Sequence, residues 1–153
     1  MKAWIEVSSD YRFDKKLSGE SGLTAPATNR YINMMDGVTK DDIILHYIIK
    51  QGATKEHESR ILAVSIAKSV MHEEPPRIVV DLKEIAILPI PVTLKEVKEI
   101  KNKSENLKKL IRMSFLRYLT EISKEDLMKI LMINSENIQY LNSLNSYKKL
   151  LEN

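Results

Sequence analysis

The fold is decided by two apolar segments in the first half of the chain. They read Ile43-Ile44-Leu45-His46-Tyr47-Ile48-Ile49 and Ile61-Leu62-Ala63-Val64-Ser65-Ile66-Ala67-Lys68. Both are rich in β-branched residues and bounded by polar turn residues, a pattern typical of buried strands. The spacer between them, residues 50–60, contains Gly52 and five charged residues and is predicted to be a hairpin loop of above-average length. The sequence therefore predicts a protein organised around a sheet.

The segments before this pair are less regular. Residues 2–8 alternate well enough to predict a first strand, with Trp4 as its largest buried residue. Residues 9–27 contain two glycines, a proline and many small polar residues, so we expect a long loop there. Such loops are often functional. Residues 29–35 are expected to form a short helix.

The segments after the pair change from strands to helices. Residues 77–90 predict one or two further strands that end at Pro89 and Pro91, because proline cannot continue a ladder. N-cap residues then predict a series of helices, which begin after Thr93, Ser104, Ser123 and Asn134. The second is expected to reach Leu119, and the tail from Tyr147 is expected to fray. This order predicts an α+β fold, with helices packed on a mixed or antiparallel sheet.

Composition limits the classes of function. The 153 residues suit a single domain over 1–153, with the last ten or so residues a helical tail or a linker to an effector domain. The absence of cysteine excludes disulfides, thiol catalysis and cysteine zinc sites. No apolar run is long enough to cross a membrane and no signal peptide is visible, so we expect a cytoplasmic protein. The high isoleucine and lysine content with four glycines is typical of thermophiles.

Charge is uneven along the chain. The net charge is +3, and residues 77–153 hold fourteen basic and ten acidic residues, about +4. This basic tilt permits nucleic-acid binding without requiring it.

The sequence has no strong catalytic or metal signature. The three histidines, His46, His57 and His72, do not have a spacing that brings them together with carboxylates, so we expect no metal and no cofactor. No nucleophile elbow, phosphate loop or zinc-protease motif is present. The paired carboxylates Asp41-Asp42 are more typical of turns than of catalysis. A small hydrolase using one of them with His46 stays an alternative, although strand geometry places Asp42 and His46 about 13 Å apart.

The aromatic residues raise a binding hypothesis. Trp4, Tyr11, Tyr31 and Tyr47 all fall in or next to the strand-loop-strand portion. A pocket that stacks a base needs aromatic faces beside backbone groups that read the base edge. Spacing alone is more typical of Trp4 and Tyr47 as core residues, with the other two on the surface.

The order of several motifs resembles the EVE domain, a PUA-like family similar in fold to the YTH readers of methylated adenine. The resemblance spans roughly residues 2–131 and rests on Trp4, the segment Gly22-Leu23-Thr24-Ala25-Pro26, Asn33-Met34-Met35, Asp41-Asp42 before the first apolar segment, the second apolar segment, and residues 110–126. The sequence is most similar to the N-terminal reader domains of McrB-type modification-dependent restriction systems. The resemblance implies a curved, barrel-like sheet flanked by helices, an aromatic cage for a flipped-out modified base, and a basic surface for the duplex.

The resemblance also implies site residues. The base pocket is expected to comprise Trp4, Ser21, Gly22, Leu23, Thr24, Ala25, Pro26, Tyr31, Asn33 and Tyr47. The nucleic-acid backbone is expected to contact Lys68, Lys101, Lys103, Arg112 and Arg117. This chain departs from the family at Asp41, where relatives have glycine, and at Thr24, where many have the cage tryptophan. A missing indole costs about 1–3 kcal/mol of stacking, so we expect Tyr31 or Tyr47 to supply that wall.

These observations predict a DNA-binding reader without catalytic activity, the targeting module of a modification-dependent restriction system. Its partners would be modified double-stranded DNA and a fused or separate GTPase or nuclease effector, with no membrane contact. The alternative is a stand-alone PUA-like protein that binds modified RNA.

Overall fold

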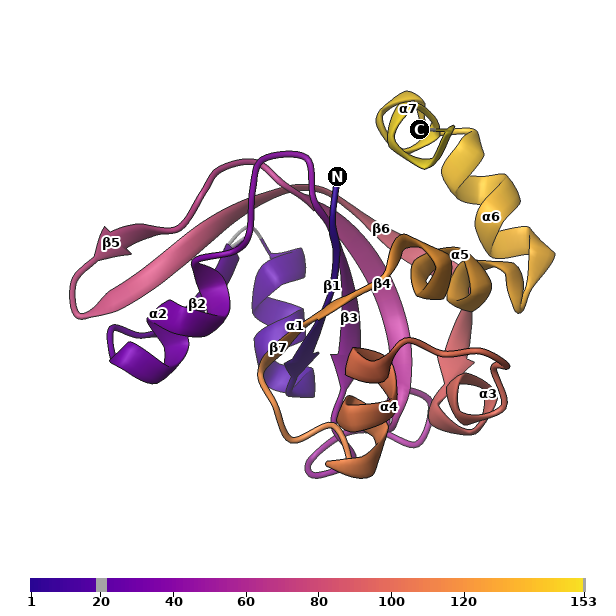
Figure 1. Ribbon diagram of the computed structural model, residues 1–153, viewed down its shortest axis with the longest axis horizontal. Helices are drawn as coiled ribbons and strands as arrows, with labels where there is room; N and C mark the ends of the chain where they lie inside the picture. The colour runs from indigo at the N-terminus through magenta and orange to yellow at the C-terminus, as the bar shows by residue number, and fades with distance from the viewer. Residues whose placement is uncertain (19–21, 153) are drawn as a thin grey trace.

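The computed structural model describes residues 1–18 and 22–152 and contains one curled, seven-stranded mixed sheet. The strand order is β2-β6-β4-β3-β1-β7, and the short strand β5 pairs with β6. In Figure 1, helices α3 to α7 are on the right-hand side of the view, and α1 and α2 lie below the left-hand part of the sheet, which is formed by β6 with β5. The predicted α+β class with a curved mixed sheet is confirmed.

The centre of the sheet contains the two apolar segments and the first strand. β1 (Ala3–Ser8) runs parallel to β3 (Ile43–Ile48), which pairs antiparallel with β4 (Arg60–Ala67). Every residue of β3 is buried, as is every residue of β4 except Arg60. The predicted strand pair is therefore confirmed.

In the segment 9–27, expected to be a long loop, the described residues 9–18 and 22–27 contain a helix and a strand. Helix α1 (Asp10–Leu17) begins after Ser9, whose side chain accepts from the backbone N–H of Arg12 at 3.2 Å. Strand β2 (Gly22–Pro26) pairs antiparallel with β6. The prediction was wrong because α1 buries only two side chains, which leaves little apolar periodicity to detect.

The strand expected to end at Pro89 continues through both prolines. β6 (Arg77–Thr93) crosses the sheet in Figure 1, pairing first with β2 and β5 (His72–Glu74) and then with β4. Between the prolines, the N–H of Ile90 donates to Asn137 Oδ1 at 3.0 Å, and Asn137 Nδ2 donates to the Ile90 carbonyl at 2.8 Å. A side chain of α6 thus satisfies the backbone where the ladder with β4 is interrupted.

The predicted helix starts are confirmed, but one helix is shorter than expected. The elements are α3 (Leu94–Lys98), α4 (Glu105–Arg112), β7 (Leu119–Ile122), α5 (Lys124–Met132), α6 (Ser135–Asn142) and α7 (Asn145–Glu152). α4 ends at Arg112 because Ser114 and Phe115 adopt left-handed backbone conformations, with φ of 53° and 56°, and turn the chain into β7. The tail from Tyr147 was expected to fray, but its described residues, 147–152, belong to α7, where the Tyr147 ring is buried and its hydroxyl donates to the Glu84 carbonyl at 2.6 Å.

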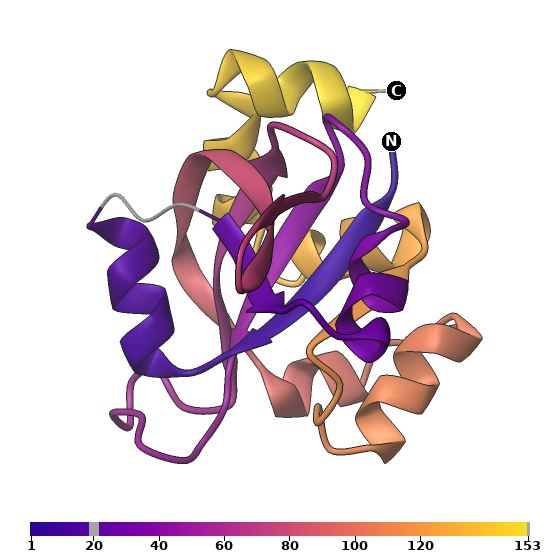
Figure 2. The ribbon, with the colours of Figure 1, turned by 90° about the vertical axis from the view of Figure 1, so that its left-hand side faces the viewer.

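The two faces of the sheet have different coverings. The outer face, which carries Ala3 and Ile5 of β1, packs against the apolar side chains of α3 to α7. The inner face carries Trp4 and Glu6 and packs against residues of β2, α1 and α2 (Asn29–Met35). In Figure 2, α1 lies at the left of the strands and α2 at their right. Within the described residues, no helix is long and apolar enough to span a membrane.

Candidate functional site

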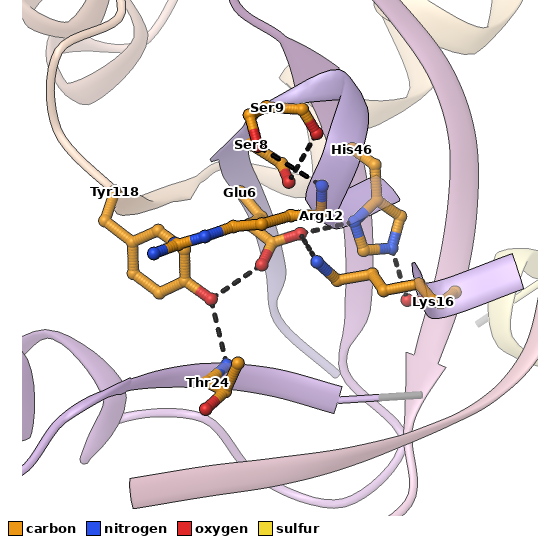
Figure 3. Close-up of polar contacts among 9 residues, drawn as sticks. Glu6, Ser8, Ser9, Arg12, Lys16, Thr24, His46 and Tyr118 are labelled. Atoms are coloured by element: carbon orange, nitrogen blue, oxygen red, sulfur yellow. Dashed lines mark hydrogen bonds and ion pairs between the residues drawn. The ribbon is translucent and has the colours of Figure 1, made fainter. Parts of the chain in front are cut away.

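A buried carboxylate on the inner face connects four elements. Glu6, in β1, is 1% exposed. Its Oε1 lies 3.1 Å from Lys16 Nζ of α1 and 2.8 Å from His46 Nδ1 of β3. Its Oε2 accepts a hydrogen bond of 2.6 Å from the hydroxyl of Tyr118, next to β7 (Figure 3). The hydrogen bond to the buried Glu6 carboxylate therefore fixes the position of the Tyr118 ring.

The electrostatics of this cluster keep Glu6 ionised. Burial alone would raise the pKa of Glu6, but the Lys16 ammonium, the hydrogen bond and charge of His46 and the Tyr118 hydroxyl lower it, leaving a pKa of about 2. Burial, followed by the charge of Glu6, raises the pKa of Tyr118 well above its ordinary value. Tyr118 is therefore a permanent donor to a permanent anion at neutral pH.

Ser65, His46 and Glu6 have the connectivity of a nucleophile, a base and an orienting acid. His46 Nε2 lies 2.7 Å from Ser65 Oγ, and His46 Nδ1 faces Glu6. All three side chains are buried, so the serine hydroxyl is out of reach of a substrate in this structure. We interpret the trio as a cross-link between β1, β3 and β4.

The hydrolase alternative required Asp42 to meet His46, and the structure gives them separate partners. The Asp42 carboxylate accepts from Trp4 Nε1 at 3.0 Å and from the Thr39 N–H at 2.9 Å, and so holds the turn before β3. Asp41 has a φ of 72°, in the left-handed region that glycine favours. This explains the departure at Asp41, because aspartate is among the side chains that tolerate this conformation.

Tyr118 also lines a hollow of about 450 Å³ at the C-terminal end of β1, which we call the tyrosine hollow. Its lining comprises Val7, Ser8, Ser9, Arg12, Arg30, Tyr31, Ile49, Phe115, Leu116 and Tyr118. The rings of Tyr31 and Tyr118 meet edge to face, with centroids 6.0 Å apart and an interplanar angle of 74°. The Arg30 guanidinium lies 5.6 Å from the centroid of the Tyr31 ring. The hollow thus combines three aromatic residues, Tyr31, Phe115 and Tyr118, with two arginines.

A second hollow, of about 360 Å³, lies beside β7, and we call it the edge hollow. It is lined by Trp4, Asn33, Met34, Gly37, Asn106, Lys109, Leu110, Met113, Arg117, Leu119, Thr120 and Glu121. The two hollows lie against the same two segments, α2 and residues 113–121.

The predicted base-pocket residues are divided between these places. Tyr31 lines the tyrosine hollow, whereas Trp4 and Asn33 line the edge hollow. Tyr47 joins neither group: it is buried on the outer face and stacks on Phe115 with ring centroids 4.1 Å apart. The structure therefore does not bring Tyr47 to Tyr31 or Trp4.

The predicted loop residues belong to β2. Gly22, Leu23 and Ala25 are buried, Pro26 is exposed at the end of the strand, and Ser21 lies outside the described residues. At Thr24, the backbone N–H donates to the Tyr118 hydroxyl at 3.1 Å and the side chain accepts from Arg77 Nε at 2.7 Å. Sequence reasoning missed Tyr118, whose hydroxyl accepts from the backbone N–H of Thr24, the residue at which relatives were expected to carry an indole.

The predicted backbone-contact residues come from several separate segments. Lys68 is exposed after β4, and Lys101 is exposed in the connection between α3 and α4. Lys103 Nζ donates to the carbonyls of Lys98 and Ile100, at 2.9 and 2.7 Å, and so caps the end of α3. Of the remaining two, Arg112 is the last residue of α4, and Arg117 lines the edge hollow. Within residues 1–18 and 22–152, no three metal-ligating side chains group together.

No family model and no curated protein matches the chain. Solved structures do match, at low sequence identity. Protein Atu2648 from Agrobacterium tumefaciens is 18% identical with a TM-score of 0.63, over 85% of this chain and 90% of that one. Human THYN1, solved with DNA containing 5-methylcytosine, is 11% identical with a TM-score of 0.62, over 87% and 97%. The N-terminal domain of Staphylothermus marinus McrB is 14% identical with a TM-score of 0.55, over 84% and 92%.

These likenesses define a class of fold. The curled mixed sheet with its flanking helices matches the PUA-like α+β fold of these neighbours, the fold that the resemblance implied. At identities below 20%, the neighbours establish the architecture that this chain shares with them and no particular member of the group.

Proposed function

We propose that this chain binds DNA that carries a modified base and holds that base, flipped out of the duplex, in the tyrosine hollow. The observation that carries the proposal is the pair of tyrosine rings beside Arg12 and Arg30. It is supported by the same fold in THYN1, which was solved with 5-methylcytosine-containing DNA, and in the McrB N-terminal domain.

The chemistry of the hollow suits a base. Its volume of about 450 Å³ falls in the range of small-molecule sites. Stacking on an aromatic ring contributes about 1–3 kcal/mol per base, which offsets the few kcal/mol needed to flip it. Ser8 and Ser9, at the end of β1, add hydroxyl and backbone groups that can read the base edge.

The arginines and the buried cluster complete the site. Arg12 and Arg30 provide fixed positive charge for the phosphates on either side of the flipped nucleotide, a contribution that weakens with salt. Tyr118 is held by Glu6 and the Thr24 N–H, so one aromatic wall is in place before the base arrives. Such preorganisation lowers the cost of ordering the site on binding.

We further propose that the chain is the targeting module of a modification-dependent restriction system. The likeness to the McrB N-terminal domain supports this role. The chain then contributes recognition and no catalysis, and cleavage belongs to a GTPase or nuclease effector on another domain or chain.

Binding titrations test the proposal. Matched duplexes of DNA and of RNA would carry 5-methylcytosine, 5-hydroxymethylcytosine, N6-methyladenine or no modification, each at two salt concentrations. We expect one modified DNA duplex to bind at least about tenfold tighter than its plain counterpart. Tyr31→Ala should remove this preference and leave the salt-dependent binding of plain DNA.

The matched control is Tyr11→Ala, because Tyr11 is an exposed tyrosine of α1 that does not line the hollow. Circular dichroism of both variants would show that the fold is intact. Equal affinity for every modified and plain duplex overturns the proposal. A preference confined to modified RNA replaces it with the RNA-binding alternative.

A further inference from the structure

The edge hollow lies at the last strand of the sheet, where backbone groups have no neighbouring strand. β7 ends the strand order, and two carbonyls of β7 are satisfied by side chains instead. Arg117 Nε donates to the Leu119 carbonyl at 3.1 Å, and Asn106 Nδ2 donates to the Glu121 carbonyl at 3.0 Å. These two side chains block pairing with a further strand and at the same time line the hollow.

The chemistry of the lining is divided. Trp4, Met34 and Leu110 are buried and give the hollow an apolar floor. Arg117 and the exposed Lys109 give it two cations. The hydrogen bond of Arg117 uses Nε, and a guanidinium has four further N–H groups on its two Nη atoms.

Amide and carboxylate groups also line the hollow. Asn33 and Asn106 carry amides of the kind that pair with base edges, and Glu121 carries a carboxylate that can accept from an exocyclic amine. A ligand with an aromatic ring and one phosphate matches this combination better than a bare anion does. The Glu121 carboxylate would repel a bare anion, whereas it can accept a hydrogen bond from a base.

Thr120, which lines the hollow, has a buried hydroxyl with no hydrogen-bond partner among the described residues. It is 8% exposed and lines the hollow. Its Oγ1 is one of two buried side-chain polar atoms that lack a hydrogen-bond partner among the described residues. Buried hydroxyls are nearly always paired in native structures, so an unpaired one beside a polar hollow calls for a partner.

We propose that the edge hollow is a second binding site that takes a nucleoside monophosphate unit, with the ring on the Trp4 floor and the phosphate at Lys109 and Arg117. The unit is either a free nucleotide or a nucleotide of the DNA strand whose modified base enters the tyrosine hollow. The second case rests on the proposed function; the first does not.

Trp4 makes the site observable, because it is the only tryptophan of the chain. Its fluorescence would be followed while the full chain is titrated with the four deoxynucleoside monophosphates, the four matching nucleosides and inorganic phosphate. We expect a saturable change with at least one nucleotide, at least tenfold weaker binding of its nucleoside, and no change with phosphate alone. A response to phosphate equal to that of the nucleotides overturns the proposal.

Two variants test the assigned contacts. Thr120→Val keeps the side-chain shape and removes the hydroxyl, and should weaken nucleotide binding about tenfold with an unchanged or raised melting temperature. Lys109→Gln should weaken binding of the nucleotide more than binding of the nucleoside, so that the two affinities become more similar. Lys101→Gln is the matched charge control, since Lys101 is exposed and does not line the hollow.

The same variants distinguish the two sources of the nucleotide. If free nucleotides bind weakly but Thr120→Val and Lys109→Gln each lower the affinity for duplex DNA, the site belongs to the strand. If neither variant changes binding of free nucleotides or of duplex DNA, the inference is wrong. Failure of the proposed function would leave the mononucleotide result standing, because that titration uses no modified base.

Discussion

The two faces of β1 differ in their interactions, although their residues alternate along six positions of one strand: the outer face makes apolar contacts and the inner face holds a buried carboxylate. Ala3 and Ile5 point outward into an apolar core closed by the C-terminal helices. Glu6 points inward to a lysine, a histidine and a tyrosine. The outer face needs only apolar volume, which many side chains supply. The inner face needs particular partners, and one of these, Tyr118, is a wall of the tyrosine hollow.

The largest effect is expected from removing the inner charge. Glu6→Gln should lower the free energy of unfolding by about 3 kcal/mol or more, because it removes the carboxylate that faces the buried Lys16 ammonium. Ile5→Val on the outer face should cost only about 0.5–1.5 kcal/mol. Urea unfolding at neutral pH would measure both. A loss below about 1 kcal/mol for Glu6→Gln would show that the cluster is no more demanding than the apolar core.

Low pH should also reduce the stability that the inner face contributes, through Glu6, and leave the contribution of the apolar outer face unchanged. The pKa of Glu6 is about 2 in the folded protein, against an ordinary value of 4.5. A lowered pKa stabilises the fold above pH 4.5, and this stabilisation is lost as the pH falls from 4.5 to 2, because the unfolded state takes up a proton that the native state refuses. For this group the loss is about 3 kcal/mol.

The measurement is the free energy of unfolding from pH 6 to pH 2. Ile5→Val should follow the wild-type slope with a constant offset. Glu6→Gln should show a shallower slope below pH 4.5, since the group that titrates is gone. Parallel curves for all three proteins would contradict the assignment of this slope to Glu6.

A smaller effect should distinguish the hydroxyl of Tyr118 from that of Tyr47. Tyr118→Phe leaves the Thr24 N–H and one oxygen of Glu6 without this hydroxyl, and should cost about 1–3 kcal/mol. It should also weaken the preference for modified DNA, because the ring is no longer fixed. Tyr47→Phe keeps the stack on Phe115 and should change neither stability by more than about 1 kcal/mol nor DNA binding. Loss of DNA binding in Tyr47→Phe alone would return Tyr47 to the base pocket.

Sequence reasoning succeeded where the determining interactions are local. The two apolar segments have enough β-branched residues to define buried strands, and the caps at Thr93, Ser104 and Ser123 are bonds across three residues. It failed at Leu119, whose spacing fits a helix that two left-handed residues interrupt. It also failed at β2, whose partner strand β6 lies more than fifty residues further on.

The candidate site was less predictable for the same reason. Tyr31 was identified, but the hydroxyl of Tyr118 meets partners 94 and 112 residues away, at Thr24 and Glu6. No local pattern encodes contacts of that range. Tyr47 was expected near Tyr31 because both are close to the same loop in sequence, whereas its position in β3 directs its ring to the opposite face.

The hydroxyl of Tyr118 has one further consequence, for the closure of the sheet. β2 and β7 are the two ends of the strand order, and Tyr118, directly before β7, reaches the backbone of β2 at Thr24. The Tyr118 side chain thus links the two edge strands of the sheet, in the place where a closed barrel has a ladder of backbone hydrogen bonds between its first and last strands. This link can break without the loss of a strand pair, because water can replace the two hydrogen bonds of the Tyr118 hydroxyl. Tyr118, which would contact the base, is therefore also the residue that links β2 to β7.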